Sequence, residues 1–248
     1  MFLANMTSPD VDALSRDLVV IMPVASLEQH SLHLPVFTDT MILQEVVNRI
    51  ENRLSRDVLI LPVMWLGYSQ HHMKYPGTVS ASSETHLAIM NDVLVCMIEH
   101  GFTQFLLINS HGGNEPNISV LRQRVMERHE DVNLYTTTPY AEPSNKRINE
   151  VLSLGTKGSG HAGECETAMI MAIDPDLVKT DALHRDGQRR QESIPGLRLY
   201  KRFDQNTEHG GLGDPRPATA EMGEQIFQVA EDFLVGAIQK IYREGSAS

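Results

Sequence analysis

The sequence predicts a single α/β domain over residues 1–248, with a central, mostly parallel β-sheet flanked by helices on both faces. Two observations lead to this prediction. Short apolar runs rich in β-branched residues alternate with longer segments of helical spacing. No internal repeat, low-complexity tract or linker divides the 248 residues, and 41% of them are hydrophobic, which is enough for one sizeable core.

Four short runs are typical of buried strands. The first reads LVVIMP at 18–23 and is apolar on both faces, as the strands of a parallel sheet are. We expect Pro23 to end it. The other three runs lie at 58–61, 105–108 and 134–137.

Helices are predicted between and after these strands. Residues 41–54 place apolar side chains four apart on one face. Ser82 or Ser83 can cap a second helix that Gly101 closes. Further helices are predicted from the end of the 109–114 loop to about 129, over 164–173 and over 220–242. The segment 188–217 shows no clear period.

Composition excludes several classes of function. A formal net charge of -11 argues against nucleic acid as a partner, because phosphate contacts need clustered Lys and Arg. No apolar run approaches the roughly 18 residues of a membrane span, and the N-terminus does not resemble a signal peptide. The two cysteines, Cys96 and Cys165, cannot build a disulfide framework, and we expect a helix-packing role for Cys165. These features favour a cytoplasmic protein.

The first group of candidate site residues follows the first predicted strand directly. Glu28, His30, His33 and Asp39 lie here, and sites in open parallel sheets form beyond the carboxyl ends of strands. Alternate side chains of an extended segment share a face, so Glu28 and His30 can converge. Carboxylate and imidazole ligands suit Zn(II), Mn(II) or Fe(II), and Asp39 has two oxygens with which to bridge two ions.

Two later loops carry similar residues. His111 follows the third predicted strand and is itself followed by Gly112 and Gly113, which permit a close backbone approach to a ligand or simply a tight turn. His161 precedes a predicted helix that contains Glu166. Taken singly, each of these residues is typical of a surface loop or a helix start. What predicts a metal site is their recurrence, twice directly after a buried strand and once where a Gly-rich loop opens a helix.

The sequence resembles the creatininase family in five segments, which occur in the family's order and span most of the chain. They are PVASLEQHSLHLPVFTD (23–39), YPGT (75–78), INSHGGN (108–114), HAGECET (161–167) and GDPRPATAEMG (213–223). The resemblance implies an α/β fold, two divalent metal ions per chain (Zn, Mn or Fe) and a homo-oligomer, commonly a hexamer.

The resemblance also implies roles for individual residues. Glu28 and His111 would bind one metal, His30 and Glu166 the other, and Asp39 would bridge them. The implied reaction is hydrolysis of a C–N bond in a small cyclic amide or formamide by a water held between the metals.

His161 would act beside the substrate as the proton carrier. Two alternatives stay open: cleavage of a C–C or lactone bond at the same centre, and a non-catalytic binding subunit. The chain has no G-x-S-x-G elbow of a serine hydrolase and no G-x-G-x-x-G after its first strand.

Some positions depart from the family pattern. Ser31 stands where glycine is usual, and we expect little consequence. Enzymes that act on creatinine carry an aromatic residue and Glu where this chain has Gly112 and Gly113, and they surround the substrate with tryptophans, whereas Trp65 is the only one here. This HGGN form therefore resembles other branches, including deformylases, rather than creatininase itself.

The loop before YPGT supplies further candidates for substrate binding. His72, Tyr75 and Thr78 can face the substrate, although Pro76 and Gly77 alone would explain the motif as a rigid turn. The neighbouring pair of His71 and His72 is interpreted as solvated rather than as a separate metal site.

Overall fold

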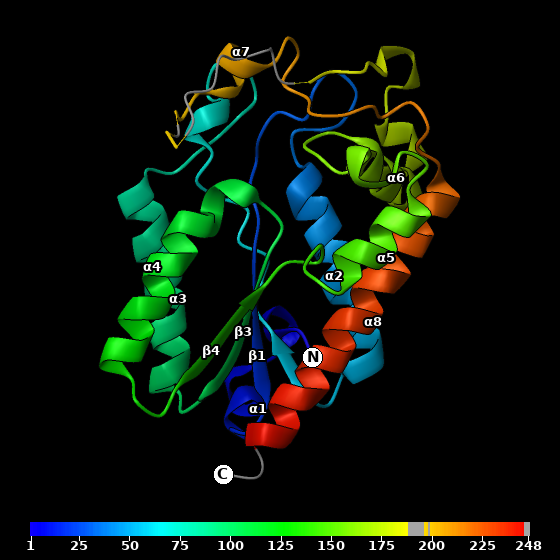
Figure 1. The fold of residues 1–248 in the computed structure, drawn as a ribbon. Helices are drawn as coiled ribbons and strands as arrows, with labels where there is room; N and C mark the ends of the chain where they lie inside the picture. Colours follow the sequence, from blue (N-terminus) through cyan, green and yellow to red (C-terminus); the bar gives the residue numbers. More distant parts are fainter. Residues whose placement is uncertain (188–195, 198, 246–248) are drawn as a thin grey trace.

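The computed structural model describes residues 1–187, 196–197 and 199–245, and its centre is a four-stranded sheet in the order β2-β1-β3-β4 (Figure 1). The strands are β1 (Val19–Val24), β2 (Val58–Ile60), β3 (Gln104–Asn109) and β4 (Asn133–Thr137). Every pair is parallel. The predicted α/β class with a parallel sheet is confirmed.

Helices cover both faces of the sheet (Figure 1). The α-helices are α1 (Ser8–Asp12), α2 (Thr38–Leu54), α3 (Ser83–Glu99), α4 (Glu115–Arg128), α5 (Ser144–Val151), α6 (Glu164–Ile173), α7 (Phe203–Asn206) and α8 (Ala220–Gly245). Short 3₁₀ helices lie at Leu3–Asn5, Gln70–His72, Gly112–Asn114, Gly155–Lys157, Pro175–Leu177 and Thr180–Ala182. Within the described ranges, no helix has the length and apolar character needed to cross a bilayer.

Two apolar cores follow from the alternation of side chains along the strands. Val19 and Ile21 face one core, which also takes buried residues of α2, α5, α6 and α8. Val20 and Met22 face the other, which is closed by α3 and α4. Ser82 caps α3 by accepting a hydrogen bond from Thr85 N, as predicted.

The structure differs from the sequence prediction at the ends of several elements and in three helices, α1, α5 and α7, that are not predicted. Strand β1 passes through Pro23 instead of ending there, because the carbonyl of Pro23 still accepts a hydrogen bond from Met64 N. Helix α2 begins at Thr38, three residues before the predicted start. Helix α5 is not predicted, since its polar sequence after Pro143 has few apolar positions to mark a period.

The strand order creates one special position in the sheet. From β1 the chain crosses outward to β2, and then returns to add β3 on the opposite side of β1. In open α/β sheets, ligands bind outside the carboxyl ends of the strands at such a reversal. Val24 and Asn109, the last residues of β1 and β3, are partners in register there.

Candidate metal centre

One group of ligand atoms, the inner cluster, consists of His30, Asp39 and Glu166. His30 follows β1, while Asp39 and Glu166 lie in the first turns of α2 and α6. His30 Nε2 is 3.3 Å from Asp39 Oδ1 and 3.8 Å from Glu166 Oε2. The same Glu166 oxygen accepts a hydrogen bond from Ala162 N at 2.7 Å, which fixes the carboxylate. One ligand atom of each of these three residues lies within 4.8 Å of the ligand atoms of the other two.

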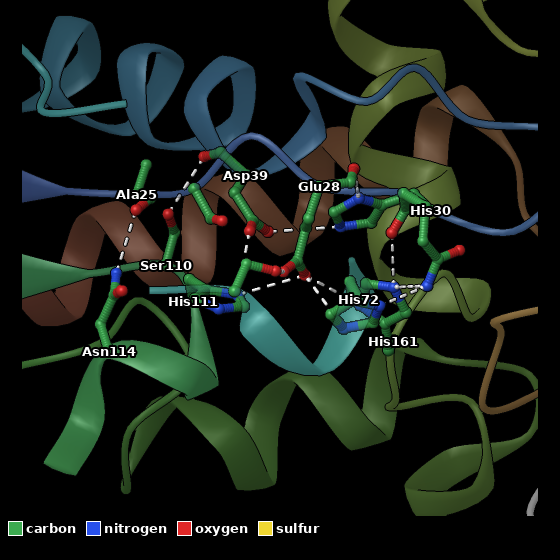
Figure 2. Close-up of polar contacts among 12 residues, drawn as sticks. Ala25, Glu28, His30, Asp39, His72, Ser110, His111, Asn114 and His161 are labelled. Atoms are coloured by element: carbon green, nitrogen blue, oxygen red, sulfur yellow. Dashed lines mark hydrogen bonds and ion pairs between the residues drawn. The ribbon is translucent and has the colours of Figure 1, made fainter. Parts of the chain in front are cut away.

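A second group, the outer cluster, consists of Glu28, His71 and His111. Its ligand atoms also lie within 4.8 Å of one another. His111 Nδ1 is 3.2 Å from Glu28 Oε1 and 3.3 Å from Asp39 Oδ2. Asp39 therefore turns one oxygen to each cluster, and Figure 2 shows it between His30 and His111.

Backbone carbonyls select which ring nitrogen each histidine presents to the centre. His30 Nδ1 lies 3.0 Å from the carbonyl oxygen of Glu28, and His111 Nε2 lies 3.1 Å from that of Tyr68. Since a carbonyl can only accept, these nitrogens carry the protons. In the neutral rings, His30 Nε2 and His111 Nδ1 would then face the carboxylates with free lone pairs, the arrangement found in metal-bound histidines.

The close contacts inside the centre are not satisfied hydrogen bonds. His30 Nε2 and Asp39 Oδ2 are buried and have no hydrogen-bond partner, although each lies 3.3 Å from an oppositely charged group. Buried polar atoms normally have partners, so two unpaired atoms that converge on the same space need an explanation. Divalent cations held between these atoms would explain them, because imidazoles and carboxylates are ligands of such cations.

The pKa values of these groups depend on one another. Burial raises the pKa of Glu28 and of Asp39, but His111 and His30 respectively outweigh it and lower both. Burial lowers the pKa of His30, and Asp39 then raises it to about 9. The pKa of His111 is likewise raised by Glu28 against burial. Protons on the two histidines thus supply the positive charge that metal ions would otherwise supply.

Burial and neighbouring carboxylates act in the same direction on Glu166. Burial raises the pKa of this carboxyl group, His30 lowers it and Asp39 raises it again, and the result is about 7. A carboxyl group with so high a pKa in a cleft is typical of a functional site.

His161 and His72 surround the remaining side of Glu28. His161 Nδ1 is 3.4 Å and His72 Nε2 is 3.6 Å from Glu28 Oε1, and Ser69 donates a hydrogen bond to Oε2 (Figure 2). His161 Nε2 lies 2.8 Å from the carbonyl oxygen of Gln29, so its Nδ1 is unprotonated. Burial, followed by the charge of His30, lowers the pKa of His161 to about 3.

A cavity of about 1160 Å³ opens onto the centre. Glu28, Asp39, His111, His161 and Glu166 contribute to its wall, together with His71, His72, Gly112 and Gly113. From there it extends past the ends of β3 and β4 to Arg122, Asn145 and Lys201. The cavity thus joins the predicted ligands to most of the predicted substrate-binding residues.

Two predicted substrate-binding residues lie outside the cavity wall. The hydroxyl of Thr78 accepts a hydrogen bond from Gln29 N at 3.1 Å. The hydroxyl of Tyr75 lies 3.3 Å from that of Thr207. Thr78 therefore supports the loop around Gln29, whereas Tyr75 contacts the segment at Thr207, and direct contact with a substrate stays a prediction for both.

Two residues of the centre have contacts that the sequence analysis does not predict. His72 is buried and faces Glu28, so the interpretation of His71 and His72 as a solvated pair is wrong. Asn114 ties the two strand ends together, because its amide donates to Ala25 O and to Asn109 Oδ1 (Figure 2). Its place in the INSHGGN segment is the one signal in the sequence that points to it.

His33 and Cys165 lie beside the centre and serve packing. His33 Nε2 lies 2.8 Å from the hydroxyl of Thr167 on α6, and His33 belongs to neither cluster. Cys165 is a free, buried cysteine in the core between the sheet, α6 and α8, as expected. Burial raises the pKa of its thiol well above the usual range.

Known proteins resemble this chain over nearly its whole length. Its residues 4–238 match the family model described as creatinine amidohydrolase. The mycofactocin precursor peptide peptidase of Mycobacterium ulcerans (strain Agy99) is 30% identical over 235 residues, which cover 89% of this chain and 84% of that protein. The creatinine amidohydrolase of Pseudomonas putida is 24% identical, with 97% and 96% covered.

Solved structures share the fold. A crystal structure of creatinine amidohydrolase (creatininase) has a TM-score of 0.78 at 25% identity, and 96% of each chain is covered. A manganese creatininase has a TM-score of 0.79 at 24% identity, with 96% of this chain and 97% of that one covered. This chain therefore belongs to the creatininase family of amidohydrolases.

Proposed function

We propose that this protein hydrolyses a C–N bond of an amide at a centre of two divalent metal ions. Glu28 and His111 would hold one ion, His30 and Glu166 the other, and Asp39 both. The observation that carries the proposal is the orientation of Asp39, whose Oδ2 faces His111 Nδ1 and whose Oδ1 faces His30 Nε2, each at 3.3 Å.

The metal ions would supply an acidified water as nucleophile and an electrophile for the amide oxygen. The protein's own contribution is orientation. The carbonyls of Glu28 and Tyr68 hold the rings of His30 and His111 with their free nitrogens toward the carboxylates. Ser69 donates a hydrogen bond to Glu28 Oε2, and His72 lies beside Oε1, the oxygen that also faces His111.

His161 is proposed as the proton carrier. Its unprotonated Nδ1 points into the centre, 3.4 Å from Glu28 Oε1. Burial lowers its pKa to about 3, so the ring is neutral and can accept a proton. The same burial makes the charged form unfavourable, which promotes transfer of that proton to the leaving nitrogen.

The substrate class is suggested by the size of the cavity. Ligand pockets commonly measure about 300–1,000 Å³, and this cavity of about 1160 Å³ exceeds what one small ring fills. A small cyclic amide or formamide can react at the centre, but the extension toward Arg122 and Asn145 favours a longer substrate. Similarity to a precursor peptide peptidase makes a peptide end a second candidate.

Metal analysis and a substrate panel test the proposal together. We expect about two ions per chain after purification without chelator, fewer in a Glu28→Gln variant, and amine release from one class among cyclic amides, formamides and short peptides. Lactones and cyclic diketones belong in the panel, because their cleavage would replace the C–N reaction. A protein that takes up none of Zn(II), Mn(II) and Fe(II) would contradict the proposal. The homo-oligomer, with a hexamer as first expectation, is tested by light scattering.

A further inference from the structure

We infer that His71 is a metal ligand in the outer cluster, beside Glu28 and His111, and that it biases this position toward Zn(II) or Fe(II) over Mn(II). The inference rests on the proposed function, because it needs the two-metal centre. It adds a ligand that neither the sequence analysis nor the proposal above includes.

The position of His71 is suited to this role. The ring comes from the 3₁₀ helix Gln70–His72 and lines the cavity next to His111. The two rings stack, with centroids 5.5 Å apart and an interplanar angle of 14°. A ligand atom of His71 lies within 4.8 Å of ligand atoms of both Glu28 and His111.

His71 also has a ring nitrogen that no hydrogen bond occupies. Among the described histidines that line the cavity, it alone has a buried ring nitrogen, Nδ1, without a hydrogen-bond partner. The adjacent His72 is committed, since its Nδ1 accepts from Gln29 Nε2 at 2.6 Å and its Nε2 faces Glu28. A buried nitrogen without a partner lowers the stability of the folded protein, and a cation bound at His71 Nδ1 would remove that cost.

Gly113 makes the arrangement sterically possible. A Cβ atom at this position would lie 2.6 Å from His71 Cε1 and 2.3 Å from His111 Nε2. At Gly112, by contrast, a Cβ atom would meet nothing within 4 Å. The absence of a side chain at 113 is therefore what allows the two imidazoles to share one wall.

The chemistry of imidazole determines the expected metal. Imidazole suits Zn(II) and Fe(II), whereas carboxylate and water suit Mn(II). With His71 added, the outer cluster offers two imidazoles and the carboxylate of Glu28, besides the shared oxygen of Asp39. Loss of His71 should then weaken Zn(II) more than Mn(II).

The test compares metal affinities of chelator-treated protein. Wild type, His71→Ala and His71→Gln are titrated with Zn(II) and with Mn(II) against a chromophoric chelator, and with Co(II) by visible absorption. We expect Zn(II) affinity at one of the two positions to fall by at least about 10-fold, since loss of a mere outer-shell partner already costs about 10- to 100-fold. Mn(II) affinity should fall less, and the Co(II) spectrum of that position should change. Free imidazole should restore Zn(II) binding in His71→Ala and not in His71→Gln.

His100→Ala, an exposed histidine after α3, is the matched control and should bind as wild type does. Unchanged Zn(II) affinities and Co(II) spectra in both His71 variants would overturn the inference and leave the proposed function intact. Uptake of no metal ion by wild type itself would overturn both. Thermal unfolding of the metal-free variants checks that they fold.

Discussion

The inner and outer clusters share Asp39 but differ in their surroundings. The inner cluster is fixed by secondary structure, since Asp39 and Glu166 lie in first helical turns, and His30 lies behind the cavity wall. The outer cluster comes from loops and from the 3₁₀ helix Gln70–His72, and all three of its residues line the cavity, whereas in the inner cluster only Asp39 and Glu166 do. The comparison suggests that the inner cluster retains its metal more firmly, whereas the outer cluster meets the substrate.

Removing the shared ligand should affect both clusters and gives the largest expected effect. Asp39→Asn takes away the charge that raises the pKa of His30 to about 9 and the oxygen that faces His111. We expect bound metal to fall well below one ion per chain by elemental analysis. The matched control is Asp92→Asn on the exposed side of α3, which should keep two. An Asp39→Asn protein that retains both ions would contradict the bridging role.

Removing the proton carrier should separate chemistry from metal binding. His161→Ala is expected to lower turnover by about 10²–10⁴-fold while both ions stay bound. His161 also lies with Glu28 and His30 in a possible three-ligand group. Metal content of the variant decides between the roles, since loss of one ion would make His161 a ligand.

Metal affinity at the inner cluster should depend on pH. The pKa of His30 in the metal-free protein is raised to about 9 by Asp39 against burial, so below pH 9 a proton occupies the nitrogen that the metal needs. Apparent affinity should therefore fall about tenfold per pH unit below 9, or roughly 100-fold between pH 9 and 7. Below about pH 7 the fall should steepen, because Glu166 takes up a proton as well. Isothermal titration in buffers of different ionisation enthalpy measures the protons released, and no release at pH 7 would contradict this.

The outer cluster should be sensitive to one backbone position and indifferent to its neighbour. Gly113→Ala forces a Cβ atom to 2.5 Å from the carbonyl oxygen of Tyr68, and such overpacking costs about 1–3 kcal/mol of unfolding free energy. Gly112→Ala enters open space and should change stability by less than about 0.5 kcal/mol. Denaturant unfolding of the metal-free proteins measures both. Equal changes in unfolding free energy for the two variants would mean that the loop relaxes to accommodate the methyl group at position 113.

The smallest effect is expected beside the inner cluster. Ser31 has φ of 57°, a left-handed conformation that favours glycine, and its hydroxyl is buried without a partner. Ser31→Gly should remove a cost of about 1–2 kcal/mol against an entropic cost of glycine of about 0.5–1 kcal/mol, and so should stabilise the protein by about 1 kcal/mol or less. Ser55→Gly, at the exposed end of α2 with φ of -54°, is the control and should not stabilise. A destabilised Ser31→Gly would show that its side chain has a role not seen in these contacts.

The sequence is most informative where chemistry is local. Apolar runs identify all four strands, and the segments that follow β1 and β3 contain Glu28, His30 and His111. The role of His71 is not predictable in this way, because its partner Gly113 lies 42 residues further along the chain. Thr78 presents the same difficulty, since its hydrogen bond to Gln29 forms only after folding.

The space shared by positions 71 and 113 has a consequence for how such chains diverge. An imidazole at 71 and a side chain at 113 compete for one volume. We therefore expect the two positions to change together. Homologous sequences with His at 71 should carry Gly at 113, and those with a large residue at 113 should lack that histidine.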